Sequence, residues 1–297
     1  MTDTTVNDDL RPRRSVLYMP AANDRALEKA QTIPADAIIF DLEDAVAPDA
    51  KRDARGKAVA AVQSGNYGER ELTIRCNGLD TQWGADDIAA AGAAAPSAVV
   101  IPKVDSVDYV DRVSGLLDAA GAPASVKIWP MIETPTAVFD VRAIAAHPRV
   151  AVLVMGTNDL AKETGAGLGG DRVAMLPWLM TCVAAARAYG LAIVDGVYND
   201  FRNEAGCVTE CGQGRLIGMD GKTLIHPGQI APANAAFAPS PEQVAAANDI
   251  IAAFALPENA GLGAINLNGR MVELLHCEIA KKTVAMSEAI SALEATS

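Results

Sequence analysis

The sequence is poor in the side chains that build zinc sites and disulfide frameworks. Its five cysteines and three histidines are scattered along 297 residues, and no His-Glu-x-x-His motif is present. Cys207 and Cys211 are four residues apart, but no second Cys/His pair lies near them in the sequence. An odd and scattered set of cysteines implies no disulfide framework. The histidine spacing disfavours a zinc centre.

Long hydrophobic runs are missing as well. No segment approaches the 18 consecutive apolar residues expected of a membrane-spanning helix. Residues 1–14 are polar and contain no apolar core of the kind found in signal peptides. We therefore predict a cytoplasmic protein that has no membrane partner.

Positive charge is in deficit. The chain has 25 lysines and arginines against 37 aspartates and glutamates, which gives a formal net charge of −12. A protein that binds nucleic acid needs a dense basic surface, so nucleic acid is not an expected partner. A small anionic ligand needs only a local group of basic side chains, and the charge balance does not exclude one.

The chain does contain a regular alternation of short apolar runs and Ala-rich segments with a helical pattern. Eight β/α units in unbroken alternation predict a (β/α)8 TIM barrel. A doubly wound open sheet is the alternative, but the segment after the first strand, 19–24, is not the glycine-rich turn of such folds. Strands are expected near 15–19, 37–43, 71–77, 98–103, 126–133, 150–157, 192–197 and 222–226. Helices are expected near 23–32, 49–63, 106–120, 135–146, 172–189, 202–213 and 241–254.

The alternation ends after Phe254. Residues 255–277 contain glycines and asparagines without a regular pattern, and a short helix is expected over about 278–293. We therefore predict a catalytic barrel domain over 1–254 and a C-terminal helical extension over 255–297. An extension to a closed barrel is expected to act as a lid over the site, to pack on a neighbouring subunit, or to do both.

Carboxylates follow three of the apolar runs. Asp41 and Glu43 share a face at the end of the second strand and Asp44 begins the loop after it. Glu133 ends the fifth strand and Asp159 ends the sixth. A carboxylate at the end of a buried strand is costly unless it is paired, hydrogen-bonded or bound to a metal. Barrel enzymes build their sites at the carboxyl ends of the strands. The fifth and sixth strands are neighbours in a barrel, so Glu133 and Asp159 are predicted to share one ion, and two carboxylates with room for water suit Mg²⁺ or Mn²⁺.

Two basic residues are expected near these acids. In the third strand Thr73, Arg75 and Asn77 share a face, so Arg75 is expected to point into the barrel. There it is either a fixed cation for an anionic substrate or one half of a structural ion pair. Lys103 ends the fourth strand, and among so many acids we interpret it as an ion-paired lysine rather than as a Schiff-base nucleophile.

The same segments resemble the citrate lyase β-subunit-like group of the HpcH/HpaI aldolase superfamily. That group includes malyl-CoA, β-methylmalyl-CoA and citramalyl-CoA lyases and malyl-CoA thioesterase. The resemblance extends in order over about residues 13–290. It is carried by Arg14–Ala21, Phe40–Val46, Arg75–Asn77, Ile101–Lys103, Ile132–Thr134, Gly156–Leu160, Asp195–Asp200 and Ile225–Ile230.

The resemblance implies a barrel that forms a homotrimer or homohexamer. It implies cleavage of a 3-hydroxy dicarboxyl-CoA into an acyl-CoA and a 2-oxo acid of the glyoxylate or pyruvate type, or the reverse condensation. It places the family's Mg²⁺ ligands on Glu133 and Asp159 and its substrate-binding arginine on Arg75. Glu43 and Asp44 fall on the acids that accompany this arginine.

Further contacts with the substrate are expected at the mouth of the barrel. Gly156, Thr157 and Asn158 belong to one of the matching segments and are predicted to bind the substrate. The phosphates of coenzyme A need basic partners, and the candidates by position are Arg14, Arg25, Lys29 and Lys51.

The tail departs from the family pattern. Family lyases have Gly-Lys-Met-Ile-Asp-x-Pro there, with the aspartate on a lid that reaches a neighbouring subunit's site. This chain has Gly-Arg-Met-Val-Glu-Leu-Leu over 269–275, so Glu273 keeps the carboxylate but places it one methylene further out. We predict that Glu273 moves a proton at the enolate carbon or activates water on the thioester. The alternative is a solvated surface acid.

The expected function is a Mg²⁺-dependent carbon–carbon lyase acting on malyl-CoA, citramalyl-CoA or a similar ester. A malyl-CoA thioesterase is the main alternative. A citrate lyase β subunit acting on an acyl-carrier-protein thioester is another. From a different class, a catalytically silent scaffold barrel is the last alternative, although the intact set of acids and Arg75 argues against it.

Overall fold

The computed structural model describes residues 10–296, and the chain divides into two compact units. The first unit contains Arg13–Phe237 and the second contains Ala238–Thr296. The polar amino-terminal segment on which the cytoplasmic prediction rests falls largely outside the described range. Within that range, no helix is both long and apolar enough to span a membrane.

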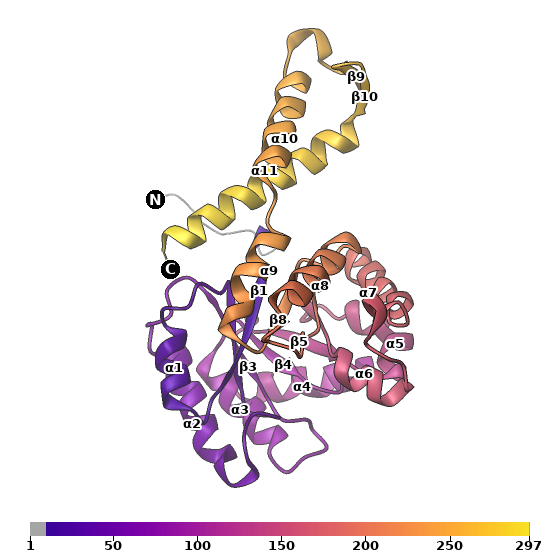
Figure 1. Ribbon diagram of the computed structural model, residues 1–297. Coiled ribbons are helices and arrows are strands. Elements are labelled where there is room, and N and C mark those ends of the chain that lie inside the picture. Colours follow the sequence, from indigo (N-terminus) through magenta and orange to yellow (C-terminus); the bar gives the residue numbers. More distant parts are fainter. Residues whose placement is uncertain (1–9, 297) are drawn as a thin grey trace. The chain divides into compact units, whose positions relative to one another are not determined.

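The first unit is a closed barrel of eight parallel strands in sequence order (Figure 1). The register brings Tyr18 beside Ile39 and Asp41 beside Arg75, and β1 pairs with β8 to close the barrel. The predicted (β/α)8 fold is confirmed. The strands are β1 Ser15–Pro20, β2 Ala37–Asp41, β3 Glu71–Arg75, β4 Ala98–Ile101, β5 Lys127–Ile132, β6 Val152–Met155, β7 Ala192–Asp195 and β8 Gly221–Leu224.

Helices lie on the outside of these strands (Figure 1). Several begin at side chains that cap the free N–H groups of the first turn, such as Asn23, Ser106 and Thr134. The helices of this unit are α1 Asp24–Ala30, α2 Lys51–Gln63, α3 Gly84–Ala94, α4 Val107–Ala119, α5 Pro135–Ala145, α6 Thr157–Thr164, α7 Leu176–Ala188, α8 Glu204–Leu216 and α9 Ile230–Phe237.

Side-chain alternation along the strands separates two apolar layers. One layer fills the barrel interior and includes the fully buried Trp129, and the other packs between strands and helices and includes the fully buried Phe40. At the amino end of β3, Glu71 forms an ion pair with Arg13, whose guanidinium lies over the Trp129 ring. The amino half of the interior is therefore filled, and inward-facing polar groups gather at the carboxyl ends.

The second unit consists of two helices with a hairpin between them in sequence. Helix α10 (Pro241–Phe254) packs on α11 (Leu274–Ala295), and β9 (Ala264–Leu267) pairs antiparallel with β10 (Arg270–Glu273). The boundary expected after Phe254 moves to Ala238, because α10 packs on α11 and belongs with the tail. The irregular structure expected over 255–277 is replaced in part by this hairpin.

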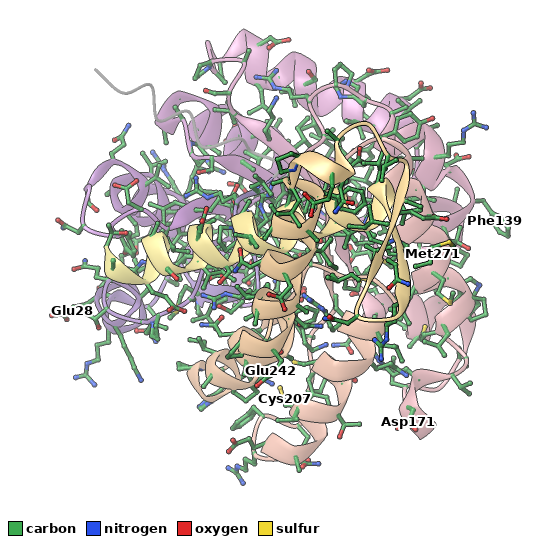
Figure 2. The ribbon with its side chains drawn as sticks, turned by 90° about the horizontal axis from the view of Figure 1, so that it is seen from above. Glu28, Phe139, Asp171, Cys207, Glu242 and Met271 are labelled. Carbon is green, nitrogen blue, oxygen red and sulfur yellow. The ribbon has the colours of Figure 1, made fainter. Side chains whose placement is uncertain are left out.

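Some apolar side chains on outer elements reach solvent. Phe139 on α5 is 88% exposed and points away from the barrel, and Met271 on β10 is 72% exposed (Figure 2). Single exposed apolar residues are common on protein surfaces and need no functional explanation.

Candidate active site

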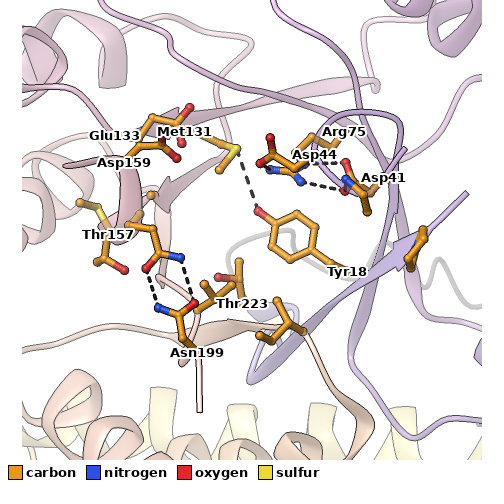
Figure 3. A pocket seen from close by; sticks show the side chains of 17 residues that line it. Tyr18, Asp41, Asp44, Arg75, Met131, Glu133, Thr157, Asp159, Asn199 and Thr223 are labelled. Carbon is orange, nitrogen blue, oxygen red and sulfur yellow. Dashed lines mark hydrogen bonds and ion pairs between the residues drawn. The ribbon is translucent and has the colours of Figure 1, made fainter. Parts of the chain in front are cut away.

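A cavity of about 350 Å³ opens where the barrel strands end (Figure 3). Inward-pointing residues of the strands and the first residues of the loops that follow them form its wall, as in other enzymes of this architecture. It contains Arg75, Glu133 and Asp159, as the sequence predicted. The lining residues are Tyr18, Pro20, Asp41, Asp44, Ala45, Arg75, Met131, Glu133, Met155, Gly156, Thr157, Asn158, Asp159, Val197, Asn199, Thr223 and Ile225.

Arg75 is clamped by carboxylates on one side of the cavity. Its Nε and Nη2 donate to the two oxygens of Asp41, each at 2.7 Å. Its Nη1 lies 2.8 Å from an oxygen of Glu43 and 3.4 Å from one of Asp44. The sequence pointed to the acids after β2 as a group, but the fork-to-fork geometry with Asp41 becomes visible only in the fold, where β2 and β3 pair at these two residues.

Glu43 is the titratable member of this cluster. Burial raises the pKa of Glu43 to about 7, the charge of Arg75 opposes the rise, and the charges of Asp44 and Asp41 add to it. A carboxyl with such a pKa changes its protonation state near neutral pH. Glu43 lies beside the cavity, in an ion pair with Arg75, which lines the cavity.

Glu133 faces the cavity directly after β5, and Asp159 faces it from the first turn of α6, which follows the neighbouring strand β6. The backbone N–H of Lys103 donates to Oε1 of Glu133 at 2.7 Å, and Lys103 adopts a left-handed conformation with φ of 52°. Burial raises the pKa of Glu133 to about 7, the Lys103 N–H lowers it, and the charges of Glu43 and Asp159 raise it further. The structure gives the Asp159 carboxylate no hydrogen bond or ion pair to another described residue. The Lys103 side chain is exposed.

A glycine between β6 and α6 makes room for Glu133. A Cβ atom on Gly156 would collide with the Cβ and Oε2 of Glu133. Only glycine therefore allows the start of α6 to approach this carboxylate so closely.

The two carboxylates fit a hard divalent cation. Across residues 10–296, no group of three or more His, Cys, Asp or Glu side chains is placed to hold a metal, and Glu133 and Asp159 are the pair that would hold an ion in this cavity. Mg²⁺ typically takes one or two carboxylates and fills its other positions with water and substrate oxygens. The cluster of negative charge around Glu133, with one backbone N–H and no cationic side chain bound to it, suits such an ion.

Several lining residues had not been singled out from the sequence. Tyr18 lies with its ring 4.6 Å from the Arg75 guanidinium carbon, and burial raises its pKa well above the ordinary value. The amides of Asn158 and Asn199 exchange two hydrogen bonds, at 3.0 and 2.7 Å. The signal for Tyr18 was its alternation with Val16 on the first strand, which places both on the inner face.

The structure corrects two of the four residues predicted to bind coenzyme A. Arg14 precedes β1 at the amino end of the barrel and is buried in an ion pair with Asp36. Lys51 is buried, and its Nζ donates to the carbonyl oxygens of Leu42 and Glu43. Both are held inside the protein, where a phosphate would not reach them.

The other basic candidates and the tail acid keep their status as predictions. Arg25 and Lys29 are exposed on α1. Glu273 is the first residue before α11, in the second unit, and its N–H donates to Nδ1 of His276 at 3.0 Å. This contact holds the backbone of Glu273 at the start of α11, and its role in proton transfer remains a prediction.

Comparison with known proteins places the site in a family. The model for HpcH/HpaI aldolase/citrate lyase matches residues 14–227, and a model for C-C bond lyases of the TIM-barrel fold matches 170–291. The chain is 48% identical to a (3S)-malyl-CoA thioesterase of Cereibacter sphaeroides, over 96% of this chain and 98% of that one. It is 34% identical to an L-malyl-CoA/β-methylmalyl-CoA lyase of the same species, over 95% and 96%.

A solved structure agrees with these relatives. The protein CitE of Mycobacterium tuberculosis, in complex with magnesium, acetoacetate and coenzyme A, superposes with a TM-score of 0.76 at 26% identity, covering 94% of this chain and 99% of that one. The predicted family is confirmed, and with it the prediction of an enzyme of the citrate lyase β type, whose relatives include carbon–carbon lyases. The chain therefore belongs to the HpcH/HpaI aldolase/citrate lyase family.

Proposed function

We propose that the protein hydrolyses the thioester of a 3-hydroxy dicarboxyl-CoA, with (3S)-malyl-CoA as the first candidate. The observation that carries this proposal is the 48% identity, over nearly the whole of both chains, to a (3S)-malyl-CoA thioesterase. The sequence alone favoured cleavage of a carbon–carbon bond, and this relative shifts the preference to the alternative.

The pocket offers the groups that the reaction needs. Held by Glu133 and Asp159, Mg²⁺ or Mn²⁺ would supply Lewis-acid polarisation of a substrate oxygen. Arg75 provides a positive charge whose orientation is fixed by Asp41. Glu43, with a pKa of about 7, is suited to accept a proton from water near neutral pH.

The size of the cavity supports a small acyl group. A volume of about 350 Å³ accommodates a short dicarboxyl chain but not a complete acyl-CoA. The nucleotide part must therefore lie outside the barrel. The exposed Arg25 and Lys29 on α1 remain the candidates for its phosphates.

Carbon–carbon cleavage is the second candidate. The relatives at 34% and 29% identity are an L-malyl-CoA/β-methylmalyl-CoA lyase and a human mitochondrial citramalyl-CoA lyase. The same Arg75, Glu133 and Asp159 would serve that reaction, because it also places charge on the acyl group. Its second product would be a 2-oxo acid such as glyoxylate or pyruvate.

A two-product assay separates these functions. Purified protein with Mg²⁺ is given (3S)-malyl-CoA, and free thiol and 2-oxo acid are followed in parallel. Hydrolysis predicts thiol in step with substrate loss and no 2-oxo acid. Formation of 2-oxo acid without thiol would instead establish the lyase. Silence on malyl-CoA and citramalyl-CoA would contradict both, and would turn attention to acyl-carrier-protein thioesters and to the scaffold alternative.

A further inference from the structure

Tyr18 presents to the cavity a hydroxyl that lacks a strong hydrogen-bond acceptor. Within the described chain, the partner that the structure gives this hydroxyl is the thioether of Met131, with Oη and Sδ 4.0 Å apart. A thioether sulfur is a weak acceptor. A partly buried O–H group without a good acceptor is unfavourable, so a ligand in this cavity gains by supplying one (Figure 3).

The hydroxyl is held in place by the barrel. Tyr18 lies in the middle of β1, paired on one side with β2, and its ring is covered by the Arg75 guanidinium at 4.6 Å. Arg75 is in turn clamped by the two oxygens of Asp41. A donor fixed in this way needs no reorganisation when charge develops on its acceptor.

The charges nearby indicate which substrate oxygen belongs there. Asp41, Glu43 and Asp44 all contact Arg75, so three carboxylates face one cation on this side of the cavity. A substrate carboxylate is repelled by this surplus of negative charge and fits better at a metal held by Glu133 and Asp159. The thioester carbonyl oxygen is neutral in the bound substrate and is not repelled.

We propose that Tyr18 is a further catalytic residue of this pocket, whose hydroxyl donates a hydrogen bond to the thioester carbonyl oxygen of the substrate. This inference rests on the proposed function only in taking an acyl thioester as the substrate. In hydrolysis, water adds to the carbonyl carbon and the C=O electron pair moves to the oxygen. That pair returns as the C–S bond breaks, and the thiolate leaves and takes up a proton. In carbon–carbon cleavage, the 3-hydroxyl gives up its proton and becomes the carbonyl of the 2-oxo acid, and the electrons of the broken C–C bond form an enolate with charge on the same oxygen. The enolate carbon then takes up a proton. One neutral donor therefore serves either route.

The test compares Tyr18→Phe with the wild type on (3S)-malyl-CoA, in whichever product channel the wild type uses. Loss of one oxyanion donor should lower kcat about a hundredfold, while KM stays close to the wild-type value because the contact strengthens only in the transition state. The matched control is Tyr67→Phe. Its hydroxyl donates to the carbonyl of Leu27 at 3.0 Å, on the outer side of the barrel wall, so kcat should not change.

Three results would overturn the proposal. Wild-type kcat in Tyr18→Phe, with an unchanged melting temperature, would show that the hydroxyl has no part in the reaction. A raised KM with an unchanged kcat would assign it to substrate binding instead. A wild type that neither hydrolyses nor cleaves the ester would refute the proposed function, and this inference with it. A wild type that cleaves the carbon–carbon bond instead of hydrolysing the thioester refutes the proposed hydrolysis but leaves the role of Tyr18 open to the same test.

Discussion

At the scale of single residues, the pocket depends on a guanidinium that is already engaged by the protein. Arg75 binds Asp41 through two parallel N–H···O bonds and also contacts Glu43 and Asp44. Buried charges are tolerated when they are paired and hydrogen-bonded. The ion pair that the sequence offered as an alternative to a substrate contact is therefore present, and the substrate contact remains a prediction for the same residue.

Arg75→Lys tests how much stability and activity depend on the bidentate contact between the Arg75 guanidinium and Asp41. An ammonium keeps the charge but cannot form both bonds to Asp41 at once. We expect the free energy of unfolding to fall by about 1.5–3 kcal/mol, the usual contribution of a hydrogen bond to a charged group, and turnover to fall with it. Urea unfolding and steady-state kinetics measure the two effects. Arg142→Lys on α5, a residue not buried in the core, should change stability by no more than about 0.5 kcal/mol. Unchanged kinetics in Arg75→Lys would show that the fork is dispensable.

Glu43 makes stability depend on pH in a direction that can be derived. Its pKa is raised from 4.5 to about 7, so the folded protein binds this proton more tightly than the unfolded chain does. Stability therefore declines as pH rises from about 5 to about 8. In metal-free protein, the free energy of unfolding of Glu43→Gln should fall over this pH range by about 2–3 kcal/mol less than that of the wild type, at about 1.4 kcal/mol per pKa unit. The exposed control Glu28→Gln should follow the wild type. A Glu43→Gln curve with the wild-type slope would contradict the assignment.

Some site residues could be found from the sequence and others could not, for identifiable reasons. Glu133 and Asp159 were found because acids at strand ends converge in a parallel barrel whatever the exact register. Arg14 and Lys51 were misassigned because a basic residue near the barrel mouth in sequence can equally be buried against Asp36 or against loop carbonyls. Such pairing depends on the neighbouring loops, which the sequence pattern does not fix.

At the scale of elements, the junction between β6 and α6 decides where Glu133 points. Gly156→Ala would press a methyl group against the Cβ of Glu133, so the backbone at this junction must shift and displace the carboxylate. We expect the binding of Mn²⁺, measured by calorimetry, to weaken at least about tenfold while the fold remains. Glu133→Gln is the reference variant. It removes the carboxylate ligand itself and should lower the rate of turnover about a thousandfold or more. The control is Gly167→Ala, in open space. Wild-type affinity in Gly156→Ala would show that Glu133 has room to adjust.

The barrel strands were predictable, and the tail hairpin was missed although it had a signal. Short apolar runs bounded by helical segments identify buried parallel strands. In the tail, Asn268-Gly269 separates two four-residue strands, and both turn residues have positive φ, of 53° and 81°. An Asn-Gly pair between strand-like segments is a strong hairpin signal. It was overlooked because β9 and β10 are only four residues long, too short for a clear alternation of apolar and polar residues.

At the scale of the whole molecule, the residues that line the pocket and the tail acid belong to different units. Arg75, Glu133 and Asp159 lie in Arg13–Phe237, whereas Glu273 lies in Ala238–Thr296. The prediction for Glu273 is that it acts on a lid at the site of a neighbouring subunit in a homotrimer or homohexamer. The alternative is that this unit only forms contacts between subunits.

Glu273→Gln distinguishes these two roles. The amide keeps the length and an acceptor oxygen at the start of α11 but cannot carry a proton, so a catalytic acid predicts a loss of kcat of about a hundredfold or more. The oligomer, measured by light scattering, should be unchanged. Glu278→Gln, an exposed acid on the same helix, is the matched control and should keep full activity. Glu273→Asp restores the carboxylate one methylene shorter, so it should recover turnover and shift the ratio of thiol to 2-oxo acid. Full turnover in Glu273→Gln with an unchanged oligomer would leave the tail a purely structural unit, and the proton transfers would then fall to the acids around Arg75.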